Sequence, residues 1–236
     1  PRQRRVWIMT ENQNGYRLNW ATLRRDWPLW ILMAAFLGVA FFIYPQLPDQ
    51  VPSHWNIHGQ VDAYSSRFFG AFFEPLLAPV LYLLLILLPL VDPRKDNYTR
   101  FANAYTFLRW ALLIFMYSLY VVTVLNSLGY TVNTGLFVKA GVAVLFMIIG
   151  NFMGQFRHNY FVGIKTPWTL ANVEVWQRTH RLGGRIWVLC GLGCLALSPF
   201  SGAWSGYLYF TLLMIMVLVP MIYSYVIFER QKRTGA

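Results

Sequence analysis

The stretch WPLWILMAAFLGVAFFIY, residues 27–44, decides the fold class of this chain. It holds no charged residue, and a helix needs roughly 20 mostly apolar residues to cross the hydrocarbon core of a bilayer. Because backbone polar groups in lipid must find their partners within the segment, the stretch is predicted to be a helix. No small-residue cleavage pattern follows it, so we expect a retained membrane span and not a cleaved signal peptide.

Further apolar runs of this kind follow along the chain. The whole chain is 57% hydrophobic and 12% charged, which is too apolar for a soluble domain to cover with polar surface. We therefore predict an all-α polytopic membrane protein, a bundle of six transmembrane helices. The five additional predicted spans are residues 72–91, 105–127, 135–153, 185–200 and 206–228.

Two features of these spans carry further expectations. Gly183 and Gly184 are expected to end a cytoplasmic helix and to start the short fifth span. Alternatively, the fifth span extends back through these two glycines, or it is tilted and tightly packed. Arg109 and Lys139 lie near the ends of the third and fourth spans, where long stems are expected to carry the charge to the membrane interface.

The basic residues fall almost entirely on one side of the predicted spans. Six Arg precede residue 27, three basic residues lie in 92–100, five in 154–185 and three in 229–236. The opposite side has Arg67 alone. Positive charge near the ends of spans resists translocation, so both termini are predicted to be cytoplasmic. Loop 45–71 is then outside the cell and loop 154–184 inside.

The predicted organisation follows from this topology. The net charge of +11 does not indicate direct nucleic-acid binding, because the basic residues lie between apolar runs and form no stripe. Cys190 and Cys194 are interpreted as packing residues, and we expect no cofactor. The predicted units are a basic cytoplasmic arm (1–26), a two-helix unit (27–91) with the outer loop, the third span and its connections (92–134), a region with the inner loop (135–228) and a basic tail (229–236).

The outer loop contains His54, His58 and Asp62, four residues apart each, among prolines and a glycine that exclude a continuous helix. Two His and one Asp could hold a metal ion, although no HExxH-like helix accompanies them. The residues favour instead a folded extracytoplasmic cap, or a recognition surface with an aromatic anchor and polar contacts. The candidate ligand-binding residues are His54, Trp55, Asn56, His58, Gly59, Asp62 and Arg67.

The inner loop is predicted to contain a short amphipathic helix. Pro167 keeps the residues before it out of the helical conformation. Thr169 and Asn172 are candidate N-caps, and Glu174 is expected to face Arg178 one turn further on. The helical spacing predicts one stripe formed by Val173, Trp176 and His180.

Two roles remain open for the inner loop, a packing scaffold and a docking face for a cytoplasmic partner. Glu174 is its only acid, and no nucleophile elbow or paired carboxylate is present, so we expect no enzyme active site here. The candidate partner-binding or structural residues are Asn159, Tyr160, Gly163, Lys165, Thr166, Pro167, Trp168, Thr169, Trp176, Thr179, His180 and Gly184.

Two stretches together carry a family resemblance. LPDQVPSHWNIHGQVDAYSSR (47–67) resembles an outer-loop signature "lP..iP.Hwn..G..D..gsK" of a small membrane domain, and NYFVGIKTPWTLANVEVWQRTHRLGG (159–184) resembles the "N...GiRtpWTl.n..vW..tHr.gG" signature of the SdpI family. The resemblance covers roughly residues 29–228. Arg67 stands where the pattern commonly has Lys, Lys165 where it has Arg, and His58 departs from it.

The resemblance implies a multi-pass protein of the bacterial cell membrane that gives immunity to a membrane-active peptide toxin met outside. In its signalling version, toxin engagement lets the protein hold a cytoplasmic transcriptional repressor at the inner face. These implications leave the toxin and the oligomeric state open. Because His58 departs from the family pattern, the resemblance favours a folded cap or recognition surface over a metal site in the outer loop.

Two alternatives from other classes stay open beside this expectation. One is a membrane-embedded, metal-dependent enzyme that uses His54, His58, Asp62 and Glu74. The other is a small transporter, in which three prolines break the second span around a cavity; they are Pro75, Pro79 and Pro89.

Overall fold

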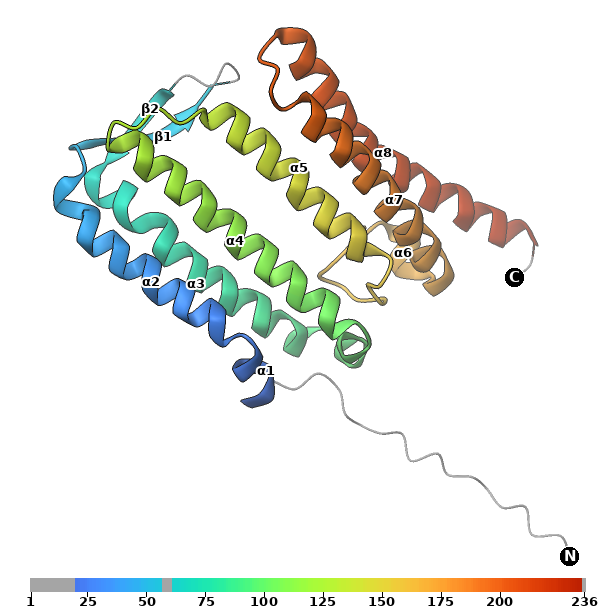
Figure 1. The fold of residues 1–236 in the computed structure, drawn as a ribbon. Helices are drawn as coiled ribbons and strands as arrows, with labels where there is room; N and C mark the ends of the chain where they lie inside the picture. Colours follow the sequence, from blue (N-terminus) through green and yellow to red (C-terminus); the bar gives the residue numbers. More distant parts are fainter. Residues whose placement is uncertain (1–19, 57–60, 235–236) are drawn as a thin grey trace, which may run out of the picture.

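The structure, a computed structural model, describes residues 20–56 and 61–234. Six long helices in this part run side by side, with a small β hairpin at one end (Figure 1). The long helices are α2 (Trp27–Ile43), α3 (Arg67–Val91), α4 (Ala102–Ser127), α5 (Thr134–Met153), α7 (Val173–Leu197) and α8 (Ala203–Thr234). The short elements are α1 (Trp20–Arg25), η1 (Tyr44–Gln46), η2 (Lys95–Phe101) and α6 (Pro167–Ala171), with strands β1 (Gln50–Trp55) and β2 (Val61–Ser66).

The helices confirm a polytopic helical membrane protein. Within the described residues, five helices are long and apolar enough to cross a membrane; they lie in segments 27–46, 67–91, 95–127, 134–153 and 203–234. Helix α7 does not belong to this set, because its first half is rich in charged residues. A sixth span within α7 therefore stays a prediction.

The expected break at Gly183 and Gly184 is wrong. Both glycines lie inside α7, which runs without interruption from the loop into the predicted fifth span. A Cβ at Gly184 would lie 2.6 Å from the carbonyl oxygen of Gly150 in α5. The glycines are therefore buried packing positions that let α5 and α7 approach closely, and they do not end a helix.

The prolines do not break the second predicted span, as the transporter alternative would require. Helix α3 continues from Arg67 to Val91 with Pro75, Pro79 and Pro89 inside it. Membrane helices tolerate proline where neighbouring elements and local adjustments satisfy the freed backbone groups. The transporter reading loses its main support, because it needed a broken helix around a cavity.

The outer loop contains a β hairpin, which the all-α prediction lacks. Strands β1 and β2 pair antiparallel, with Gln50 opposite Ser66 and Trp55 opposite Val61, and with irregular register near His54. Val51 is buried against residues of α2, α3 and α4, including Ala40 and Tyr120. The side-chain hydroxyl of Ser66 accepts a hydrogen bond from the backbone of α3 and caps it. The hairpin is thus a packed continuation of the helices.

The loops lie in two groups, one at each end of the bundle, as the charge pattern predicted (Figure 1). At the hairpin end, Lys139 Nζ donates to the carbonyl of Phe200 at 2.7 Å, which joins the start of α5 to the α7–α8 turn. At the other end, Asn97 Nδ2 donates to the carbonyl of His158 at 2.7 Å, which joins η2 to the inner loop. The end with η2 and the inner loop is the one with most of the cations.

Candidate functional site

The hairpin presents an exposed histidine–aspartate pair. His54 Nδ1 lies 2.5 Å from Asp62 Oδ1 across the two strands, and the side chains are 67% and 43% exposed. Asp49 pairs with Arg67 at 2.7 Å and is itself exposed. Exposed ion pairs of this kind contribute little to stability. The pair is therefore available for hydrogen bonds and charge contacts to a molecule that approaches the hairpin.

The other predicted outer residues are less fully placed. Trp55 and Asn56 are half-buried at the end of β1, and His58 and Gly59 lie outside the described residues. In the described parts of the chain, no three His, Cys, Asp or Glu residues come together as metal ligands. A metal site here would therefore need the segment that contains His58, and the described geometry offers only His54 and Asp62.

Asn159 organises the inner loop from within. It is fully buried, and its Oδ1 accepts bonds from the backbone amides of Phe161 and Val162 at 2.9 and 2.7 Å. Its Nδ2 donates to the carbonyls of Arg157 and Val162. The hydroxyl oxygen of Tyr98 lies 3.3 Å from Asn159 Oδ1. Buried amides with this many partners hold a loop in one conformation.

Asp92 ties the same loop to the end of α3. Its carboxylate accepts bonds from the Tyr98 hydroxyl at 3.0 Å and from the Tyr160 backbone amide at 2.9 Å, and it is buried. Sequence reasoning counted Asp92 only as part of a basic connection. The spacing of 68 residues between Asp92 and Tyr160 gave no local signal for their contact.

His180 and Trp176 are buried inside the inner-loop fold. The Nδ1 of His180 lies 2.8 Å from the Trp176 carbonyl, and its Nε2 accepts a bond from the Ile164 amide at 2.9 Å, so Nδ1 bears the proton. Trp176 Nε1 donates to the Phe156 carbonyl at 2.8 Å. Burial lowers the pKa of His180 to about 4 and also lowers the pKa of His158. Both rings are thus neutral at physiological pH, and their geometry is that of a scaffold.

The helix signals of the inner loop are partly confirmed. Asn172 caps α7, and Arg178 pairs with Glu174 at 2.5 Å, as predicted. Thr169 is not an N-cap, because Thr166 caps α6 and the two threonines form a reciprocal capping box. Val173 is not on the buried stripe; it is exposed because the buried side of α7 runs through Val175 and Thr179.

The remaining predicted inner residues divide into buried and accessible groups. The hydroxyl oxygens of Thr166 and Ser224 lie 3.0 Å apart. The ring centroids of Trp168 and Tyr225 lie 5.0 Å apart. These two contacts attach the inner loop to α8. Pro167 starts α6. The exposed members of the predicted set are Tyr160, Gly163, Lys165 and Pro167.

A buried ionic cluster near the end of the bundle that carries η2 and the inner loop was missed by sequence reasoning. Asp26 Oδ2 accepts a bond from Arg109 Nη2 at 2.7 Å, and the two side chains are 0% and 2% exposed. Trp110 Nε1 and the Tyr82 hydroxyl donate to the same carboxylate at 3.1 and 3.2 Å. The expectation that Arg109 reaches the interface is wrong, because an aspartate within the bundle pairs with it. The sequence signal for this cluster was an arginine inside a predicted span, because such residues usually face the bundle interior and pair with another charge.

Fold and loops together define a polytopic helical membrane protein with two paired strands at one end and, at the other, a loop held by buried side chains. Residues 155–224 match the SdpI/YfhL protein family, and residues 31–78 match a domain of unknown function (DUF1648). These matches confirm the resemblance to the SdpI family and place the protein among multi-pass bacterial membrane proteins.

One curated relative is the "Immunity protein SdpI" of Bacillus subtilis (strain 168). It is 34% identical over 114 residues, a stretch that covers 48% of this chain and 55% of the relative. The chain thus matches about half the length of this relative. No solved structure matches the chain.

Proposed function

We propose that this protein is a non-enzymatic membrane immunity protein that binds a membrane-active peptide at its hairpin end. The similarity to an immunity protein supports the class. The observation that carries the location is the exposed His54–Asp62 pair on a hairpin that is packed onto the helices. The two side chains, with Trp55 and Arg67, would contact the peptide.

The hairpin is connected to the helices in a way that could transmit binding. Val51 of β1 packs so closely against α3 that a Cβ at Gly70 would overlap its side chain. The Tyr120 hydroxyl of α4 donates to the Ala71 carbonyl of α3 at 2.8 Å. A peptide that binds one arrangement of these helices better than another would shift their balance.

A cytoplasmic repressor would dock at the opposite end, as part of the same proposal. Trp176 and His180 are buried, so they would support the docking surface and not form it. The exposed Tyr160 and Lys165 would contact the repressor. Such signalling requires that peptide outside and repressor inside favour the same arrangement of the bundle.

The test is survival of a toxin-sensitive bacillus that expresses the chain, challenged with several membrane-active peptides. We expect survival to rise with the unaltered chain. His54→Ala and Asp62→Ala are expected to reduce survival much more than they reduce the amount of protein in the membrane. No protection against any peptide by the abundant, unaltered chain would contradict the proposal.

The chain offers a matched control for these substitutions. Glu174 and Arg178 form an ion pair of similar exposure, 53% and 50%, at the other end of the bundle. Glu174→Ala therefore removes a comparable pair with a comparably small effect on stability. We expect it to leave protection intact. Equal losses of protection and abundance in the hairpin variants would assign His54 and Asp62 a structural role.

A further inference from the structure

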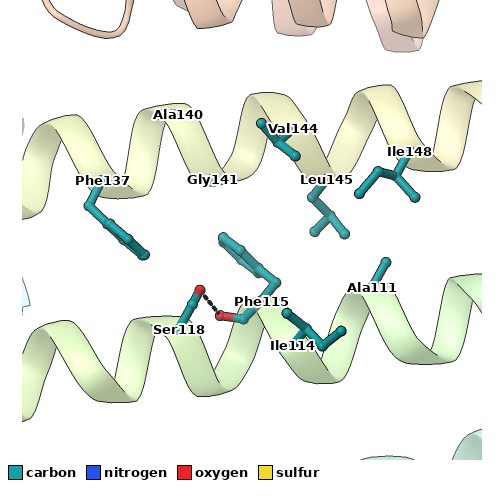
Figure 2. A pocket seen from close by; sticks show the side chains of 10 residues that line it. All are labelled: Ala111, Ile114, Phe115, Ser118, Phe137, Ala140, Gly141, Val144, Leu145 and Ile148. Carbon is teal, nitrogen blue, oxygen red and sulfur yellow. Dashed lines mark hydrogen bonds between the residues drawn. The ribbon is translucent and has the colours of Figure 1, made fainter.

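An apolar groove lies between α4 and α5, on the surface of two membrane-spanning helices. Its volume is about 320 Å³. Figure 2 shows side chains from both helices that point into it, among them Phe115 from α4 and Phe137 and Leu145 from α5. The groove is distinct from the hairpin, from the inner loop and from the buried Asp26–Arg109 cluster.

Small residues create the depth of the groove. Ala111, Ala140 and Gly141 leave room between the helices. The Phe115 ring lies over Gly141, where a Cβ would be only 2.8 Å from ring atom Cε2. A larger residue at position 141 would push this ring into the space that is now open.

The lining offers no free polar group. Ser118 is the polar side chain among the lining residues, and its hydroxyl donates to the Phe115 carbonyl at 2.6 Å (Figure 2). An occupant would therefore have to be apolar, because a polar group placed there would lose its hydrogen bonds to water without replacement.

The dimensions of the groove suit a single hydrocarbon chain. On α5 the lining runs from Phe137 to Ile148, which at about 1.5 Å per residue corresponds to roughly 16 Å along the helix. One leaflet of the hydrocarbon core of a bilayer is about 15 Å thick. The groove is thus about as long as the acyl chain of a lipid in one leaflet.

The groove is continuous with the surface that faces the bilayer. Ile114, Val144 and Ile148 line it and are also exposed, at 51%, 43% and 37%. The helices that carry them, α4 and α5, belong to the membrane-crossing set. Lipid chains therefore surround the opening and lie parallel to it.

We infer that the groove between α4 and α5 is a binding site for one acyl chain of a membrane phospholipid. The acyl chain fills the space beside Val144 and Ile148. It thereby completes the packing of two helices that meet through small residues. This site is independent of the proposed immunity function, because none of its residues belongs to the hairpin.

The test uses the full chain in vesicles of phosphatidylethanolamine and phosphatidylglycerol that contain a phospholipid with a diazirine in the middle of one acyl chain. After photolysis, mass spectrometry locates the cross-linked residues. We expect the cross-links to concentrate on residues 111–118 and 137–148. Cross-links spread evenly over all lipid-facing helices would overturn the inference.

A groove-filling variant sharpens the test. Ala111→Leu with Ala140→Leu fills the groove without adding polarity, and cross-linking there is expected to fall to the level of the exposed face of α2. The control is Ala34→Leu with Ala35→Leu, two exposed positions of α2, which should leave cross-linking unchanged. Undiminished labelling in the filled variant would contradict the inference. If the filled variant does not fold, the distribution of cross-links on the unaltered chain still decides.

Discussion

Asp26 and Arg109 form a salt bridge of 2.7 Å in which the two side chains are 0% and 2% exposed. The pair joins the start of α2 to α4, and Tyr82 brings α3 into the same cluster. Three membrane-spanning helices thus meet at one carboxylate.

Breaking this pair is expected to destabilise the bundle strongly. Asp26→Asn or Arg109→Met alone leaves one partner without its counter-charge, at a cost of about 3–5 kcal/mol. The double variant removes both charges and should regain most of that loss. The free energy of unfolding in mixed detergent micelles measures all three. Additive losses in the double variant would show that the two side chains do not act as a pair.

Gly163 is expected to tolerate no side chain. Its φ is +123°, and a Cβ there would overlap Nε2 of His180. Gly163→Ala should cost about 1–3 kcal/mol for the backbone, and about 1–3 kcal/mol more because the bond between His180 and the Ile164 amide is lost.

Gly129 provides the control for this substitution. Its φ is +89°, and a Cβ at this position would have no neighbouring atom within 4 Å, so Gly129→Ala carries only the backbone cost. Thermal unfolding of the two variants separates the backbone cost from the cost of the lost hydrogen bond. Equal destabilisation would mean that the packing of Gly163 against His180 contributes nothing.

The stability of the inner loop is expected to fall with acid. The unfolded chain protonates His180 near its ordinary pKa of 6.5, whereas the folded protein does so only near 4. Between these values the unfolded state binds more protons, so stability is complete above pH 6.5 and falls by about 1.4 kcal/mol per pH unit from there down to about pH 4.

The neighbouring His158 has a pKa lowered in the same direction and adds to this trend. Burial is the main cause; Arg94 contributes to lowering the His158 pKa and Asp92 opposes it. Equilibrium unfolding between pH 7.5 and 4.5 measures the slope, and NMR of the imidazole nitrogens follows His180 itself. A His180 that protonates near pH 6.5 in the folded protein would contradict its burial.

Five of the six predicted spans lie in helices that are long and apolar enough to cross a membrane, because long uncharged runs have few alternatives in lipid. Helix α2 ends at Ile43, one residue before the end of the predicted span 27–44. Helix α5 begins at Thr134, one residue before the start of the predicted span 135–153. The hairpin was missed because its strands are short and contain Pro52 and adjacent polar residues. The turn that joins them lies outside the described residues.

The buried ionic cluster and the inner loop were harder to predict, because the residues in contact there are far apart in the sequence. Asp26 and Arg109 are 83 residues apart, and the sequence analysis assigned Arg109 to the membrane interface and left Asp26 in the basic arm. The histidine and tryptophan residues of the inner loop were identified as important, but only the packing around α7 shows that His180 and Trp176 are buried.

The most direct test of the account is the side of the membrane on which each end of the bundle lies. Tyr64→Cys, Lys165→Cys and Ser201→Cys place single thiols at exposed positions of the hairpin, the inner loop and the α7–α8 turn. The native Cys190 and Cys194 are buried and give little background. In intact cells, a membrane-impermeant maleimide should label positions 64 and 201, and position 165 only after permeabilisation. Labelling of position 165 without position 64 would contradict the account, and failure to label position 201 would show that α7 does not cross.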